Sequence, residues 1–112
     1  MKYSLPLPKD KKLTVVVRIE SGCLGPKGAD HIQAFCEFAQ IQVEPLDADF
    51  VHWEIIPRHD KSLPEMEYGT INKTLTHDKA DKYLSMFNKS LDTFEDHIHH
   101  KLTELIDHYL GH

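Results

Sequence analysis

The stretch THDKADKYLSMFNKSLDTFEDHIHHKLTELIDHYL, residues 76–110, decides how the rest of the chain is interpreted. Its apolar residues recur every three or four positions, which is the period of an α-helix with one buried face. This stripe consists of Ala80, Leu84, Phe87, Leu91, Phe94, Ile98, Leu102, Leu105 and Tyr109. Thr76 is a suitable N-cap and no glycine or proline follows before Gly111. The pattern predicts one long amphipathic helix, or two helices that meet near Asn88.

The length of this helix raises a question about what covers it. A continuous helix over these residues would span roughly 50 Å at about 1.5 Å per residue, and three short strands cannot cover it along its full length. The helix therefore either breaks near Asn88 and folds back, or buries its second half against another chain. The second alternative predicts a homodimer with the interface residues Leu91, Phe94, Ile98, Leu102, Leu105 and Tyr109.

The residues before the stripe predict a small sheet and one helix. Alternating apolar side chains indicate strands over residues 13–20 and 50–57. Residues 65–75 are more weakly patterned and predict a third strand that pairs with the second as a hairpin. Asp30 is a suitable N-cap with a glutamine three positions later, so a helix is expected from there to about Gln40.

The order strand, helix, strand, strand, helix predicts the fold class. We expect a single α+β domain over residues 1–112, a two-layer sandwich of a small mixed sheet with helices on one face. The helical connection favours parallel pairing of the first two strands. Residues 1–12 contain two prolines and are expected to form an extended arm.

Composition excludes several classes of function. The formal net charge of −5 argues against nucleic-acid binding, where a basic surface supplies most of the affinity. No apolar run approaches the ~18 residues of a membrane span, and no apolar signal segment precedes the first strand. A cytoplasmic protein is therefore expected.

Residues 22–28, with the sequence GCLGPKG, form the most unusual local stretch. Gly22, Gly25 and Gly28 would let the backbone approach a ligand closely, and the following helix N-terminus together with Lys27 would suit a small anion. The spacing matches neither a dinucleotide-binding fingerprint nor a Walker A loop. The alternative interpretation is a tight strand-to-helix connection that needs glycine and proline for its shape.

The two cysteines have different surroundings in the sequence. Cys23 lies in the glycine-rich loop, where Lys27 and the helix dipole would favour a thiolate. A nucleophilic cysteine needs a base, and His52 and His59 are candidates if the fold brings them close. Cys36 lies on the buried stripe of its own helix and is expected to be structural.

The chain has nine histidines, several of them in the C-terminal helix. His100, Glu104 and His108 are spaced four apart on one helix face, so neighbouring pairs could share a metal ion. A closed zinc site needs four converging ligands. A solvated helix face with acid–histidine pairs is therefore the alternative.

The strand over residues 50–57 has two different faces. Trp53 points to the apolar side and is expected in the core. Phe50 and His52 point to the other side. If helices cover only one face of the sheet, these two side chains would form an exposed binding surface.

These features predict a small cytoplasmic binding protein that dimerises through its C-terminal helix and takes a protein partner or a small anionic ligand. One alternative is a thiol-dependent enzyme or redox protein that uses Cys23 with a histidine partner. Another is metal binding through the histidine face of the C-terminal helix.

Overall fold

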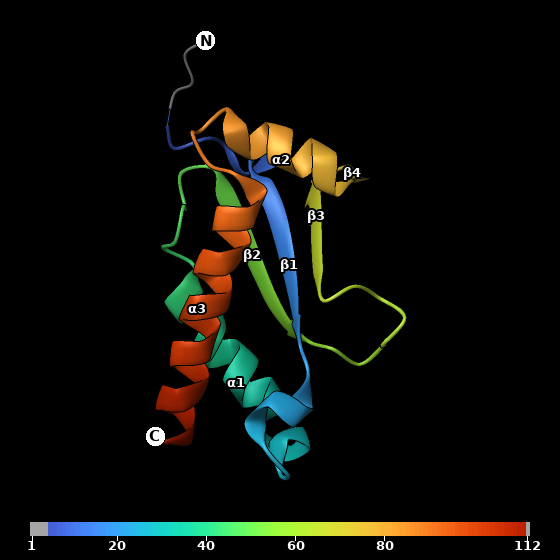
Figure 1. Ribbon diagram of the computed structural model, residues 1–112, viewed down its shortest axis with the longest axis vertical. Helices are drawn as coiled ribbons and strands as arrows, with labels where there is room; N and C mark the ends of the chain where they lie inside the picture. Colours follow the sequence, from blue (N-terminus) through green and yellow to red (C-terminus); the bar gives the residue numbers. More distant parts are fainter. Residues whose placement is uncertain (1–4, 112) are drawn as a thin grey trace.

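The computed structural model describes residues 5–111 and has an α+β architecture (Figure 1). Four strands form one mixed sheet in the order β2-β1-β3-β4. The elements, with η for a 3-10 helix, are η1 (Lys9–Lys11), β1 (Leu13–Ile19), η2 (Ser21–Leu24), α1 (Gly28–Val43), β2 (Val51–Pro57), β3 (Met66–Thr70), β4 (Lys73–Leu75), α2 (His77–Ser85) and α3 (Leu91–Leu110). The predicted α+β class is confirmed, with one strand more than expected. Among the described residues, no helix is long and apolar enough to cross a membrane.

Strand β1 lies at the centre of the sheet. It pairs in parallel with β2, as predicted, and in antiparallel fashion with β3, so that Val15 lies opposite both Trp53 and Tyr68. The predicted hairpin between the second and third strands is therefore wrong. Residues 65–75 instead contain a hairpin of their own, because β3 pairs with β4.

The outer edge of β2 is occupied by a helix side chain, which explains why β3 does not pair there. The amide nitrogen of Gln40 on α1 donates to the Trp53 carbonyl oxygen at 2.8 Å, and the Ile55 backbone N–H donates to the Gln40 oxygen at 2.8 Å. Such bonds satisfy the edge that another strand would otherwise pair with. The chain after β2 instead passes the end of β1, and β3 pairs with the free edge of β1.

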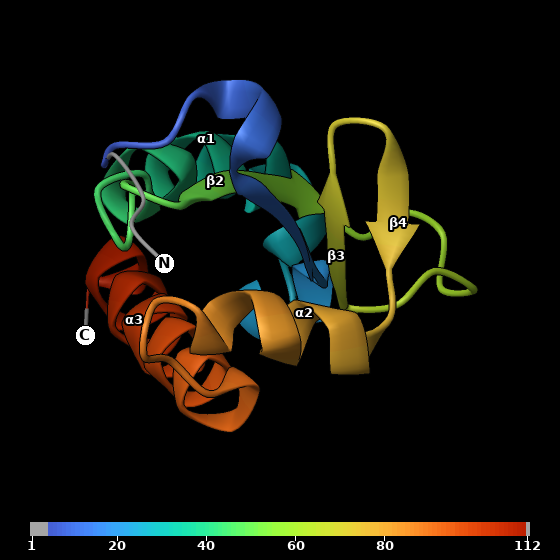
Figure 2. The same ribbon diagram turned by 90° about the horizontal axis from the view of Figure 1, so that it is seen from above.

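The core lies between one face of the sheet and the helices. Alternate residues of β1 are buried, and Figure 2 shows α2 and α3 on one side of the sheet with α1 beside β2. Trp53 is in the core as predicted: its ring stacks on Phe94 of α3 at 5.2 Å between centroids, and its indole N–H donates to the Leu46 carbonyl oxygen at 2.7 Å. Burial of large aromatic rings contributes strongly to such a core.

The C-terminal stretch breaks between α2 and α3, near the predicted position. Asn88 has a left-handed φ of 62°, which asparagine tolerates better than most residues. The Ser90 hydroxyl then accepts from the Thr93 backbone N–H at 3.2 Å, and Asp81 accepts from the Leu91 N–H at 2.8 Å. These bonds cap the start of α3 and join it to α2.

Because the chain breaks at Asn88, the apolar stripe of residues 76–110 is not left uncovered, as the predicted dimer interface required. Its α3 members pack into the core of the same chain, and the buried ones are Leu91, Phe94, Ile98, Leu102 and Leu105. Tyr109 is half-buried and packs edge-on against the Phe35 ring at 5.4 Å between centroids. The homodimer stays a prediction, without the exposed stripe that motivated it.

Two smaller expectations are also corrected. Helix α1 begins at Gly28 rather than at Asp30, since the close turn needs a glycine: a Cβ at Gly28 would lie 1.7 Å from the Ser21 carbonyl oxygen. In the expected extended arm, Lys9–Lys11 form the short helix η1. Residues 1–4 of that arm lie outside the described part of the chain.

Candidate functional site

A cleft of ≈510 Å³ lies where the end of β1, the helix η2 and the helix α3 meet. Its apolar lining comes from Ile19, Leu102 and Ile106, and the first two of these are almost fully buried. The remaining lining residues are Arg18, Glu20, Gly22, Cys23, Glu65, His99 and Thr103. An apolar lining with a few polar groups at its rim is typical of sites for small molecules.

The helix η2 positions Cys23 at this cleft. The backbone N–H of Cys23 donates to the Glu20 carbonyl oxygen at 3.0 Å, and this bond closes the turn after β1. Leu24 is buried and anchors η2 in the core, whereas Gly22 and Cys23 are exposed. Gly25 follows with a φ of 88°, a conformation that favours glycine, and redirects the chain into α1.

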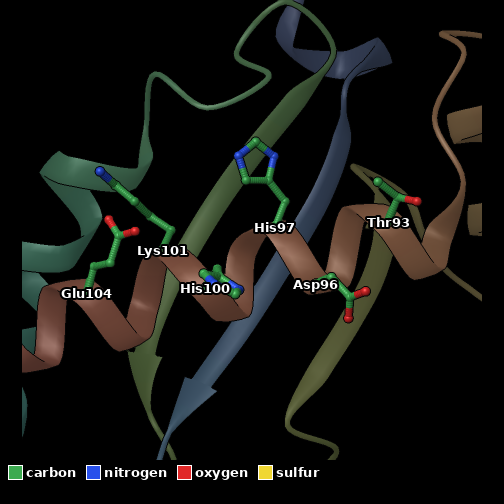
Figure 3. Close-up of a pocket in the computed structure, with 6 residues that line it drawn as sticks. All are labelled: Thr93, Asp96, His97, His100, Lys101 and Glu104. Atoms are coloured by element: carbon green, nitrogen blue, oxygen red, sulfur yellow. The ribbon is translucent and has the colours of Figure 1, made fainter.

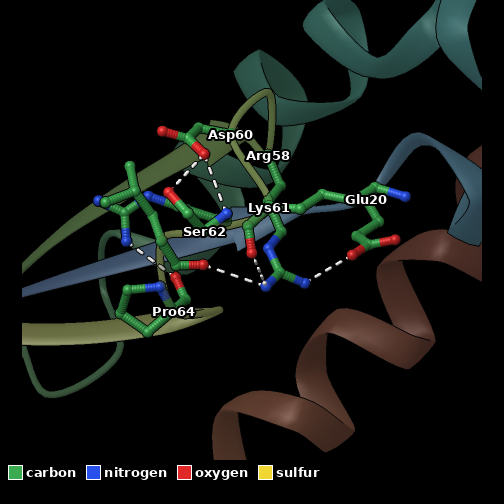
Figure 4. A network of polar contacts seen from close by, with 8 residues as sticks. Glu20, Arg58, Asp60, Lys61, Ser62 and Pro64 are labelled. Atoms are coloured by element: carbon green, nitrogen blue, oxygen red, sulfur yellow. Dashed lines mark hydrogen bonds and ion pairs between the residues drawn. The ribbon is translucent and has the colours of Figure 1, made fainter.

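Arg58 fixes one residue of the cleft lining, Glu20, through the network of polar contacts in Figure 4. Its guanidinium pairs with the Glu20 carboxylate through Nη1 and donates through Nη2 to the carbonyl oxygens of Leu63 and Lys61, at 3.0 and 3.3 Å. Charge-assisted bonds of this kind are stronger than those between neutral groups. Arg58 therefore fixes both the connection between β2 and β3 and the carboxylate of Glu20.

Arg18 is held in a similar way on the neighbouring part of the wall. Its Nη2 lies 3.0 Å from a Glu67 carboxylate oxygen, and its Nη1 donates to the Pro64 carbonyl oxygen at 2.8 Å. In the same connection, hydrogen bonds from Ser62 hold the pKa of Asp60 below its usual value. This side of the cleft is therefore fixed by bonds to the β2–β3 connection.

The predicted histidine partners of Cys23 lie elsewhere. His52 is on the open face of the sheet, where its Nε2 lies 3.5 Å from Glu54. His59 lines a separate cavity of ≈120 Å³ together with Ser21. Neither lines the cleft, so the proposed pairs of Cys23 with His52 or His59 are not formed there.

His99 lines the cleft with Cys23 and was not among the predicted site residues. A signal was present in the sequence: His99, Thr103 and Ile106 follow one another at helical spacing and form a row beside the main apolar stripe. An isoleucine outside the stripe indicates that this flank of the helix is also partly covered.

The glycine-rich loop, residues 22–28, forms the tight connection that leads from β1 into α1. Of its predicted ligand-binding residues, only Gly22 lines the cleft, while Lys27 is exposed and precedes α1. The Gly28 N–H donates to the Gly25 carbonyl oxygen and the Asp30 N–H to that of Lys27, both at 3.0 Å. These bonds leave fewer donors free for an anion at the start of α1.

A second hollow lies on the solvent side of α3 (Figure 3). It has a volume of ≈530 Å³ and is lined by α3 alone, through Thr93, Asp96, His97, His100, Lys101 and Glu104. We call it the outer groove. In Figure 3 the side chains of His97 and Asp96 point to different sides of the helix.

The predicted metal ligands do not form a site of three. Among residues 5–111, no group of three or more His, Cys, Asp or Glu side chains could hold a metal ion. His100 and Glu104 line the outer groove, whereas the ring of His108 stacks on Phe38 at 6.1 Å. A metal ion bound by His100 and Glu104 alone would have too few protein ligands for a closed zinc site.

Two further predictions concern buried side chains. Cys36 is buried as expected, and its burial raises the pKa of the thiol from 9.0 to about 11. Phe50, predicted to be exposed, is buried and stacks on Phe87 at 4.4 Å between centroids. Phe50 therefore belongs to the core, and the predicted binding surface of Phe50 with His52 is wrong.

Comparison of the chain with known protein families, with curated proteins and with solved structures finds no significant match. The function must therefore be argued from the chemistry of the cleft.

Proposed function

We propose that this protein binds a small organic ligand in the cleft between η2 and α3. The observation that carries the proposal is the convergence of three separate parts of the chain on one hollow with an apolar lining. Ile19 of β1 and Leu102 of α3 both contribute to this lining. Apolar surface of this kind binds the hydrocarbon part of a ligand by removing it from water.

The polar rim would orient the ligand. Arg58 fixes the Glu20 carboxylate, and Glu67 fixes the Arg18 guanidinium, so both groups are held before any ligand arrives. Groups that are already held lose less conformational entropy on binding. Cys23, His99 and Thr103 add donors and acceptors around the opening.

A fragment screen with ligand-observed NMR tests the proposal. Thr103 is exposed on α3 and lines the cleft, so Thr103→Trp should fill the opening and abolish binding of the fragments that bind the original protein. Glu104→Trp is the matched control, because Glu104 is the next residue and lies at the outer groove. Equal binding by both variants would contradict the proposal.

A second function rests on a different observation, namely that the exposed Cys23 shares the cleft with His99. A histidine beside a thiol can accept its proton and increase the fraction of thiolate, which is the nucleophilic form. The second candidate is therefore thiol chemistry on a ligand held in the same cleft.

Alkylation kinetics test this second candidate. If His99 activates Cys23, iodoacetamide should react with Cys23 at pH 7 about tenfold faster than with an ordinary thiol, whose pKa is about 8.5. His99→Asn should remove that excess, while His97→Asn at the outer groove should not. An ordinary rate for Cys23, unchanged in His99→Asn, would leave only the binding function.

A further inference from the structure

We infer that the ligand of the cleft is a small amphipathic cation, a hydrocarbon body that carries an ammonium group. This inference rests on the proposed function and names the chemical class of its ligand. It follows from which charges at the rim are already neutralised within the protein.

Two of the three charged groups at the rim have partners of opposite sign. Arg18 pairs with Glu67 at 3.0 Å, and only 11% of the Arg18 side chain is exposed. Glu20 pairs with Arg58. Each pair contributes little net charge to the cleft, because the two charges compensate each other at short range.

Glu65 is the charge that remains. It lines the cleft and is exposed, and it has no ion-pair or hydrogen-bond partner for its side chain among residues 5–111. Its backbone carbonyl accepts from the Arg18 backbone N–H at 2.8 Å, so the position of the main chain is fixed while the carboxylate is available. The rim therefore has a net negative charge.

The remaining polar groups are compatible with an ammonium group. The Cys23 thiol and the Thr103 hydroxyl have no full charge in their protonated forms. His99 is the other polar group at the rim, and a neutral imidazole there would not repel a cation. A cation above Glu65 would be favoured, and an anion there would be repelled.

The position of Lys27 explains why the earlier expectation of an anionic ligand does not apply to this cleft. That expectation depended on Lys27 and the start of α1, and Lys27 does not line the cleft. The acidic net charge of the chain, −5, also favours cationic ligands over anionic ones at long range.

Three probes of equal chain length test the inference: hexylamine, hexanol and hexanoate. Their dissociation constants are measured at pH 8 by NMR titration of the amide signals of Cys23, His99 and Thr103. We expect hexylamine to bind about twofold to fivefold more tightly than hexanol, which lies within the usual range for an exposed ion pair. Hexanoate should bind more weakly than hexanol.

Glu65→Gln removes the charge and keeps the shape of the side chain. This variant should bind hexylamine no better than hexanol, whereas Glu104→Gln, with the same change in net charge at the outer groove, should keep the preference. Equal affinity of the original protein for amine and alcohol would overturn the cationic ligand class and leave binding in the cleft intact. No response of the cleft signals to any of the three probes would overturn both.

Discussion

The cleft and the outer groove lie on different sides of α3 and have similar volumes, ≈510 and ≈530 Å³. They differ in how they are built. The cleft takes its lining from β1, η2, the β2–β3 connection and α3, and includes buried apolar side chains. The outer groove takes its lining from polar residues of α3 alone, all of them exposed except the half-buried Lys101. Volume alone therefore does not identify a binding site.

The physical basis of this difference is what holds the side chains in place. Around the cleft, Arg58 and Arg18 each bond to carbonyl oxygens of the β2–β3 connection, which fixes the rim. At the outer groove all the side chains come from one helix, and long side chains such as that of Lys101 lose entropy on binding. Substitutions on the two sides of α3 test this difference.

The largest effect should come from the buried side of α3. Ile98 is 0% exposed, so Ile98→Ala should lower the free energy of unfolding by about 2–5 kcal/mol through lost burial and a cavity. The neighbouring change His97→Ala at the outer groove should alter it by less than ~0.5 kcal/mol. Urea unfolding monitored by tryptophan fluorescence measures both. Similar losses for the two variants would show that the outer side of α3 is also covered.

A pH effect should distinguish the core cysteine from the cleft cysteine. Burial raises the pKa of Cys36 from 9.0 to about 11, so above pH 9 the unfolded chain releases this proton while the folded chain keeps it. The free energy of unfolding should therefore fall as the pH rises from 9 toward 11, by up to about 2 kcal/mol from this group.

Cys36→Ala should make the fall over this pH range smaller, which separates the cysteine from other groups that titrate there. Cys23→Ala should leave the slope unchanged, because Cys23 is exposed. Unfolding curves at several pH values check this, and an equal slope in the original protein and in Cys36→Ala would contradict it.

A smaller loss is expected at the wall of the cleft. Arg58→Ala removes the ion pair with Glu20 and two hydrogen bonds to carbonyl oxygens, at a side chain that is only 20% exposed. We expect the free energy of unfolding to fall by about 1–2 kcal/mol. Amide signals of the cleft should shift and those of His97 and His100 should not. Equal shifts at the cleft and at the outer groove would mean that Arg58 stabilises the whole fold and not the cleft in particular.

The smallest effect is expected for the acid and histidine side chains of the outer groove. His100→Ala should change both the free energy of unfolding and the affinity of a cleft ligand very little, within ~0.5 kcal/mol, because His100 is exposed and lies at the outer groove. Thermal unfolding with and without the ligand measures both quantities. A clear loss of affinity in this variant would mean that the ligand binds at the outer groove and not in the cleft.

Much of the fold could be predicted from local patterns. The alternation in β1, the helical period of residues 76–110 and the tendency of asparagine and serine to start a new helix at residues 88–90 are local properties, and each led to the correct type of element. The pairing of β3 could not be predicted in this way. It depends on Gln40, which occupies the edge of β2 from a helix more than ten residues away in the chain.

The site was less accessible to prediction than the fold. The sequence identified Cys23 and Gly22 as unusual, and both line the cleft. His99 was missed because other residues of the cleft lining come from η2 and β1, and only the packing of α3 brings these elements together. A helical wheel shows which side of α3 is apolar, but it cannot show that η2 lies beside one flank of that side.

Chemical-shift mapping with nitrogen-15-labelled protein would show which side of α3 binds the ligand. Fragments from the screen are added to the original protein, and the amide signals that move are assigned. A ligand in the cleft should shift the signals of Gly22, Cys23 and Thr103 and leave those of the outer-groove residues His97 and Glu104 unaffected. Shifts confined to His97 and Glu104, or no shifts at the cleft with any fragment, would contradict binding in the cleft.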